Sequence, residues 1–146
     1  MEDNAYAIMR NRNGCIAMIH STATQWQHRF RLEITLQEGL LELTGILSGS
    51  KSYGEEKLRI IPRMRGSDTG SFNEINTSYL EDNSWHDEVD EFADLVTRDN
   101  PVINGNSQDA LKVMELVYRI YYADSRWREQ FNIMNPDDTK KGGGCE

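Results

Sequence analysis

The stretch that decides the fold is Asp82–Ile133, DNSWHDEVDEFADLVTRDNPVINGNSQDALKVMELVYRIYYADSRWREQFNI. Its first part is acidic but places apolar residues at the spacing of one helix face: Trp85, Val89, Phe92 and Val96. That spacing predicts an amphipathic helix. Asn83 or Ser84 can cap the start of this helix, and Asn100-Pro101 marks its end.

A second, far more apolar helix is predicted after the Gly105 turn, with Ser107 as its cap. Only three polar residues interrupt the apolar surface of this helix: Lys112, Glu115 and Arg119. A helix with so narrow a polar stripe is typical of a buried position. Gln130–Ile133 is expected to add a short final strand to the sheet described next.

The amino-terminal half has the patterns of strands and turns. Asn13-Gly14 supplies the positive φ that a tight hairpin turn needs, and Gln37-Glu38-Gly39 predicts a second turn. The segment between residues 65 and 76 is expected to be a loop. Five strands are predicted, at Ala5–Arg10, Cys15–Ala23, Phe30–Leu36, Leu40–Thr44 and Lys57–Ile61.

The strand at Phe30–Leu36 has the clearest alternation in the chain. One face holds Phe30, Leu32, Ile34 and Leu36, and the other holds Arg29, Arg31, Glu33 and Thr35. A period of two with one apolar and one polar face predicts a half-buried strand. The expected fold class is therefore α+β, a mostly antiparallel open sheet covered on one face by helices. It occupies residues 1–134, and the polar, Gly-rich tail 135–146 is expected to be disordered.

Composition narrows the classes of partner and compartment. The chain has 146 residues and a formal net charge of -8, which argues against nucleic acid or an anionic membrane as the partner. It has no run of about 18 apolar residues and no apolar core segment near its amino terminus, so a cytoplasmic location is expected. Cys15 is expected to be a small core residue, and pairing with Cys145 is not predicted.

The sequence lacks the motifs of several kinds of catalytic site. No G-x-G-x-x-G follows a strand, so no dinucleotide site is predicted. Gly45–Ser52 departs from the spacing of a phosphate-binding loop and is better interpreted as a turn between strands. His20, His28 and His86 do not have metal-ligand spacing, so no metal is expected.

The order of these elements resembles a known family. Glu88 and Phe92 fit an acidic E-x-x-x-F helix, Pro101 and Gly105 followed by Ala110-Leu111 resemble a P-x-x-x-G-x-x-A-L loop, and Tyr122 and Ser125 fit Y-x-x-S. The segment Glu2–Ala7 is similar to a strand written E-D-x-A-x-A. Together they resemble the C-terminal domain of the Gfo/Idh/MocA oxidoreductases (glucose-fructose oxidoreductase and inositol dehydrogenase-like proteins), without their Rossmann domain.

The resemblance implies a function for a larger protein. The family uses NAD(P), bound by an amino-terminal Rossmann domain, a Lys in an E-K-P motif and an Asp/His pair. None of these has a counterpart in this chain, so no catalytic, cofactor-binding or metal-binding residue is predicted here. NAD(P) is expected only for a full-length family member, and whether this chain is itself an enzyme stays open.

The same resemblance assigns two candidate sites. Substrate is expected at a strand end that combines hydrogen-bonding groups with an aromatic ring, as sugars and polyols require. The substrate-facing candidates are His20, Thr22, Gln25, Trp26 and His28. The alternative is that Trp26 covers core while the others are solvated. The interface candidates, expected on the open sheet face, are Arg29, Arg31, Glu33, Thr35 and Glu42, which could equally be plain surface.

Three functions remain open from the sequence. The first is the C-terminal substrate-binding and oligomerisation part of an NAD(P)-dependent sugar or polyol oxidoreductase, a fragment inactive alone that self-associates and needs the missing Rossmann domain or a full-length relative. The second is a stand-alone, non-catalytic module that self-associates through its sheet. The third is an independent domain that binds a small molecule through the segment His20–Arg29.

Overall fold

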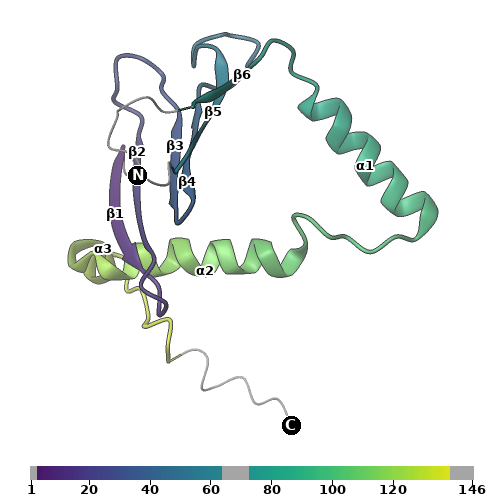
Figure 1. Ribbon diagram of the computed structural model, residues 1–146. Helices are drawn as coiled ribbons and strands as arrows, with labels where there is room; N and C mark the ends of the chain where they lie inside the picture. The colour runs from purple at the N-terminus through teal and green to yellow at the C-terminus, as the bar shows by residue number, and fades with distance from the viewer. Residues whose placement is uncertain (1–2, 64–72, 139–146) are drawn as a thin grey trace. The chain divides into compact units, whose positions relative to one another are not determined.

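The computed structural model describes residues 3–63 and 73–138, and it has the α+β class that the sequence predicts. The described residues form two antiparallel sheets and three helices (Figure 1). The chain divides into two units, one of Met1–Ala5 with Ser21–Glu91 and one of Tyr6–His20 with Phe92–Glu146. Each sheet and each helix is therefore described by itself.

The first sheet is a hairpin of β1 (Asn4–Arg10) and β2 (Ile16–Thr22). Gly14 closes its turn with φ of 84°, and its N–H donates to the Asn11 carbonyl at 3.1 Å. The prediction of positive φ at the Asn-Gly turn is thus confirmed. The prediction of a core position for Cys15 is wrong, because this residue precedes β2 in the turn and is exposed.

The second sheet contains β3 (Arg31–Leu36), β4 (Gly39–Thr44), β5 (Glu56–Pro62) and β6 (Ile75–Tyr79), in that order and all antiparallel. The expectation of a loop up to Asn76 is wrong at its end, because β6 pairs with β5 from Ile75 onwards. Residues 65–72 of that predicted loop lie outside the described residues. Pairing with β5, which provides the backbone partners, makes this short polar segment a strand.

The register divides this sheet into two unlike faces. Leu32, Leu43 and Leu58 are opposite one another on successive strands, as are Ile34, Leu41, Ile60 and Ile75, and they form what we term the apolar face. The other surface, here the charged face, contains Arg31, Glu33, Thr35, Leu40, Glu42, Lys57, Arg59 and Ile61. The alternation predicted for Phe30–Leu36 is confirmed by the register within β3, which begins one residue later than expected. The prediction that this strand is half-buried is wrong, because all six residues of β3 are exposed.

The segment between β4 and β5 reverses the chain through a tight contact at Gly45. Gly45 has φ of 73°, and its N–H donates to the carbonyl of Phe30 at 3.1 Å. A Cβ at this position would overlap the backbone carbonyl of Glu55. Only glycine therefore fits where the chain leaves β4. The interpretation of Gly45–Ser52 as a turn between strands is confirmed.

The helices are α1 (Ser84–Arg98), α2 (Ser107–Ala123) and α3 (Ser125–Gln130). The predicted cap of α2 is wrong by one residue, because the Asn106 side chain accepts from the Asp109 N–H at 2.9 Å. The predicted strand Gln130–Ile133 is also wrong. The Asp124 carboxylate accepts from the Trp127 N–H at 3.0 Å and so starts α3, which contains Gln130.

Two sets of contacts join α2 and α3 to the residues that follow α3. The ring of Trp127 lies between those of Tyr121 and Phe131, with centroid separations of 5.1 and 4.8 Å. Asn135 to Asp138 form a turn in which Asp137 pairs with Arg119 of α2 at 2.7 Å. The remainder of the predicted tail, residues 139–146, lies outside the described residues.

No apolar side chain among the described residues is fully buried. In the four-stranded sheet, β4 is half-buried throughout, whereas Leu36 of β3 is 53% exposed. The core of this unit is therefore centred on β4 and β5. It is thin, because Leu32, Ile34 and Ile75 on the apolar face stay exposed.

Gly45→Ala tests the importance of the β4–β5 reversal. The added Cβ forces either a strained positive φ or displacement of the Glu55 carbonyl. We therefore expect the free energy of unfolding to fall by about 2 kcal/mol or more. Urea unfolding followed by circular dichroism measures this. Gly49→Ala is the matched control, since a Cβ there has no atom within 4 Å. Equal stability of the two variants would contradict the account.

Candidate functional site

The charged face contains a row of ion pairs that crosses the strands. The Glu42 carboxylate lies between two guanidinium groups, 2.8 Å from Arg31 Nε and 3.2 Å from Arg59 Nη1. Arg31 also pairs with Glu33 at 2.7 Å, and Arg59 pairs with Glu74 at 2.5 Å. Glu42 is only 12% exposed, so it is the most shielded charge of the row. Its two partners offset the cost of that burial.

These contacts change the acidity of the paired groups at the outer end of the row. The hydrogen bond from Arg59 holds the pKa of Glu74 below its ordinary value of 4.5. The hydrogen bonds to Glu74 and, secondarily, to Glu42 raise the pKa of Arg59. Both shifts favour the charged forms, so the row is an ion-pair network at neutral pH.

Four of the five interface candidates belong to this face. Arg31, Glu33, Thr35 and Glu42 lie on it, as the alternation predicts. Arg29 precedes β3 and instead lines a cleft at the end of the sheet. Whether these residues form an interface remains a prediction.

That cleft, termed the rim cleft, has a volume of about 460 Å³. Three segments of the same unit form it: residues 27–31 before and at the start of β3, the end of β4, and the residues leading into β5. Its lining consists of Gln27, His28, Arg29, Phe30, Arg31, Glu42, Thr44, Gly45, Tyr53, Gly54, Glu55 and Lys57. The volume falls within the usual range for small-molecule sites.

Inside the rim cleft, His28 is held by polar and aromatic contacts. Its Nδ1 lies 2.8 Å from the Ser52 hydroxyl, and its ring centroid is 5.0 Å from that of Tyr53. The Ser52 hydroxyl in turn lies 2.8 Å from that of Ser50. The Ser52 contact leaves Nε2 as the ring nitrogen available to a ligand.

The five substrate-facing candidates belong to different segments and make different contacts. His20 lies on β2 and stacks on Tyr6 at 4.2 Å, whereas His28 is in the other unit. The Thr22 hydroxyl bonds that of Thr24 at 3.1 Å, and Gln25 is exposed in the following loop. Trp26 is fully exposed and so is not covering a core. Only His28 among them lines the rim cleft.

Sequence reasoning missed the residues that come from the far side of the cleft. Tyr53 and Lys57 face the segment with His28 because Arg31 pairs with Thr44, which in turn pairs with Lys57. The stretch Ser48–Gly54, which is rich in serine and glycine, is a signal that could have found them. Strand register, which the sequence did not specify there, brings the two segments together.

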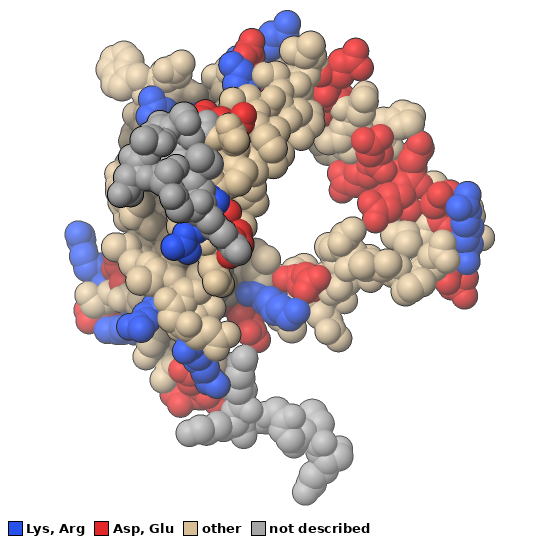
Figure 2. All heavy atoms as spheres, viewed as in Figure 1, with Lys and Arg blue, Asp and Glu red and all other residues tan. Residues whose placement is uncertain are grey.

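Other charged groups are dispersed. Acidic side chains gather over α1 on the face that Figure 2 displays, and His86 Nδ1 lies 3.3 Å from Asp90 there. Within the described residues, no group of three or more His, Cys, Asp or Glu side chains could hold a metal ion. No helix in the same part of the chain has both the length and the apolar character needed to cross a membrane.

The pKa of Glu74 predicts how acid affects the sheet. Because the folded-state pKa lies below 4.5, its ionised form stabilises the folded state above that pH, and this stabilisation is lost as the pH falls through the folded-state pKa. We expect Glu74→Gln to lose less stability than the parent protein between pH 6 and pH 3, measured by urea unfolding. Glu81→Gln, outside the row, is the control. A parent-like pH profile for Glu74→Gln would contradict this role.

Comparison of the chain with protein-family models, curated proteins and solved structures finds no match. One sheet unit offers two candidate surfaces for function, the charged face with its ion pairs and the rim cleft at the end of the sheet.

Proposed function

We propose that this chain is the C-terminal substrate-binding and oligomerisation part of an NAD(P)-dependent sugar or polyol oxidoreductase. In this role it self-associates through the charged face and leaves cofactor binding and catalysis to a Rossmann domain elsewhere in the assembly. The finer fold type, an open antiparallel sheet covered on one face by helices as in Gfo/Idh/MocA proteins, is part of the proposal. The observation that supports it most is the charge balance of this sheet face.

The charged face is nearly neutral although the chain is strongly acidic. Its strands contribute three cations, Arg31, Lys57 and Arg59, and two anions, Glu33 and Glu42, and Glu74 adds a third anion. The chain as a whole has a net charge of -8. Two copies can therefore approach through this face without the repulsion that their acidic surfaces impose.

The same face also offers apolar area for contact. Thr35, Leu40 and Ile61 are opposite one another on β3, β4 and β5, beside the ion pairs. Leu40 and Ile61 are half-buried, so their remaining surface is available to a partner. A small apolar strip beside paired charges has the composition of a non-obligate interface. A second copy fits it best, because a two-fold axis lets each charge of one sign meet its opposite.

The substrate role of this part rests on the loop that follows β2. Gln25 and Trp26 are exposed there, and the half-buried Thr22 precedes them at the end of β2, so this segment has side chains able to bind hydroxyl groups and the apolar side of a sugar. In the proposed enzyme the Rossmann domain brings the nicotinamide to this substrate. Hydride transfer therefore requires the complete protein.

Thr35→Arg tests self-association through the charged face. Each copy gains a cation at the contact, so we expect the dissociation constant of the dimer to rise about tenfold or more in sedimentation velocity. The substitution also lowers the net negative charge of the chain. A general charge effect would therefore strengthen association, and weakening must come from the contact itself.

Thr77→Arg is the matched control, because Thr77 lies on β6 and on the apolar face. It makes the same chemical change on the other edge strand of the described sheet. Association should stay at the parent level or increase slightly. If Thr77→Arg disrupts the dimer while Thr35→Arg leaves it intact, the apolar face is the interface and the proposal is wrong.

The assignment to an oxidoreductase makes a separate prediction. Titration of the isolated chain should leave the fluorescence of NADH unchanged, because it lacks a glycine-rich dinucleotide turn. Antibodies against the chain should precipitate from its source cells a larger product that reduces NAD(P) with a polyol. A native product of 16.8 kDa without such activity would instead indicate a stand-alone module.

A further inference from the structure

The rim cleft is a concave site within one unit of the chain, and its charge differs from that of the molecule. Three cationic side chains line it, Arg29, Arg31 and Lys57, against two carboxylates, Glu42 and Glu55. One positive charge is thus in excess, before any proton on His28 is counted. On a chain with a net charge of -8, such a local excess marks a site that attracts anions.

The ion pairs within the cleft leave its excess positive charge on Arg29. Glu55 is paired with Lys57 at 2.5 Å, and the hydrogen bond from Lys57 lowers the pKa of Glu55. Glu42 is shared between Arg31 and Arg59, and Arg59 lies outside the lining. Both carboxylates are therefore neutralised by other groups. Arg29 has no ion-pair partner among the described residues and is the cation left for a ligand.

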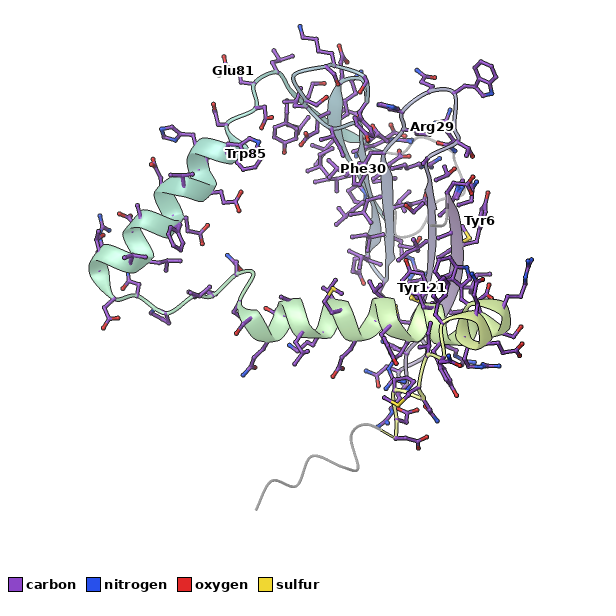
Figure 3. The ribbon with its side chains drawn as sticks, turned by 180° about the vertical axis from the view of Figure 1, so that it is seen from behind. Tyr6, Arg29, Phe30, Glu81, Trp85 and Tyr121 are labelled. Carbon is purple, nitrogen blue, oxygen red and sulfur yellow. The ribbon has the colours of Figure 1, made fainter. Side chains whose placement is uncertain are left out.

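Arg29 is placed to meet a ligand together with His28. Both belong to the segment before β3, where Figure 3 labels Arg29 beside Phe30. A guanidinium group binds carboxylate or phosphate oxygens through two parallel N–H donors. When the Ser52 hydroxyl donates to Nδ1 of His28, the ring proton lies on Nε2, which then supplies another donor.

The cleft also has surface for a carbon skeleton. Tyr53 and Phe30 contribute aromatic rings, and the Tyr53 ring packs against that of His28. Aromatic faces cover C–H groups, while the fork of Arg29 fixes one anionic end. Inorganic anions need only the cations. The combination therefore favours an organic anion.

We infer that the rim cleft binds a small organic anion, a carboxylate or phosphate monoester, through Arg29. This goes beyond the proposed function, whose substrate is a sugar or polyol met at the loop after β2. The site lies within one unit of the chain and needs neither the Rossmann domain nor a second copy. Ligand binding and oxidoreductase activity can therefore be tested separately.

The test uses three probes with one carbon skeleton: glycerol 1-phosphate, glycerate and glycerol. Binding to the full chain is measured by calorimetry and by the amide resonances of Gly45 and Gly54, which line the cleft. We expect glycerol 1-phosphate or glycerate to bind and shift these resonances, and glycerol to leave them in place. The stronger of the two anions identifies the preferred headgroup. Added salt should weaken binding, because the cations are exposed.

Arg29→Gln should weaken binding about tenfold, since it removes a charge-assisted pair to the ligand. Arg12→Gln is the matched control: Arg12 is an exposed residue of the β1–β2 turn and does not line the cleft. It makes the same charge change and should bind as the parent does. Arg29 has no ion-pair partner in residues 3–63 and 73–138, so the melting curve of the Arg29→Gln variant should match the parent curve.

Three results would overturn the inference. Glycerol could bind as tightly as the anions, Arg12→Gln could weaken binding as much as Arg29→Gln, or neither anion could shift the Gly45 and Gly54 resonances at millimolar concentration. None of these results bears on self-association through the charged face. Conversely, a monomeric chain without an NAD(P)-linked native product would leave the anion site intact.

Discussion

The register of β4 between β3 and β5 is the constraint on which the sheet unit depends. Glu42 is opposite Glu33 on one side and Arg59 on the other, while Leu41 is opposite Ile34 and Ile60. A shift of one residue would move Leu41 and Leu43 to the charged face and Glu42 to the apolar face. Glu42 would then lose both guanidinium partners, an expensive outcome for a carboxylate that is 12% exposed. Hydrophobic and ionic contacts therefore favour the same alignment.

That alignment also distributes charge unevenly over the molecule. The sheet combines its acids with arginines and lysine, whereas the acids of α1 outnumber the bases there and lie open to solvent. The two surfaces respond differently to salt. Screening weakens the repulsion between the acidic surfaces of α1 helices, whereas on the charged face it weakens the exposed ion pairs. The charged face and the rim cleft belong to one continuous set of strands. The proposed self-association and the proposed anion binding would thus use neighbouring arginines of one sheet unit.

The parts of the fold that the sequence predicts are those specified by short-range patterns. The alternation from Leu32 to Leu36 and the Asn13-Gly14 turn each determine their own local geometry, and both are confirmed. The strand expected at Gln130–Ile133 failed because one capping contact, from Asp124, starts a helix there. Strand β6 was missed because its five residues, INTSY, acquire their conformation from pairing with β5. Local composition alone did not distinguish that segment from a loop.

The candidate site divides in the same way. His28 was identified because polar and aromatic residues cluster in its own segment, but Tyr53 and Lys57 come from a segment about 25 residues further along and face it only through strand pairing. The expected grouping of His20 with His28 stays a prediction, because these residues lie in different units. Spacing rules assume one helix or one strand, so they do not predict which residues of two different elements lie together.

The order of strands in the larger sheet, β3-β4-β5-β6, follows their order along the chain. Each strand therefore pairs with the one synthesised just before it, and no pairing waits for a distant segment. Loop closure for such neighbours costs little chain entropy, and sheets with local pairing form faster than those joined by distant crossovers. Residues 31–79 precede all three helices. Hairpin by hairpin, this sheet can form on the ribosome while the helical half of the chain is still being made.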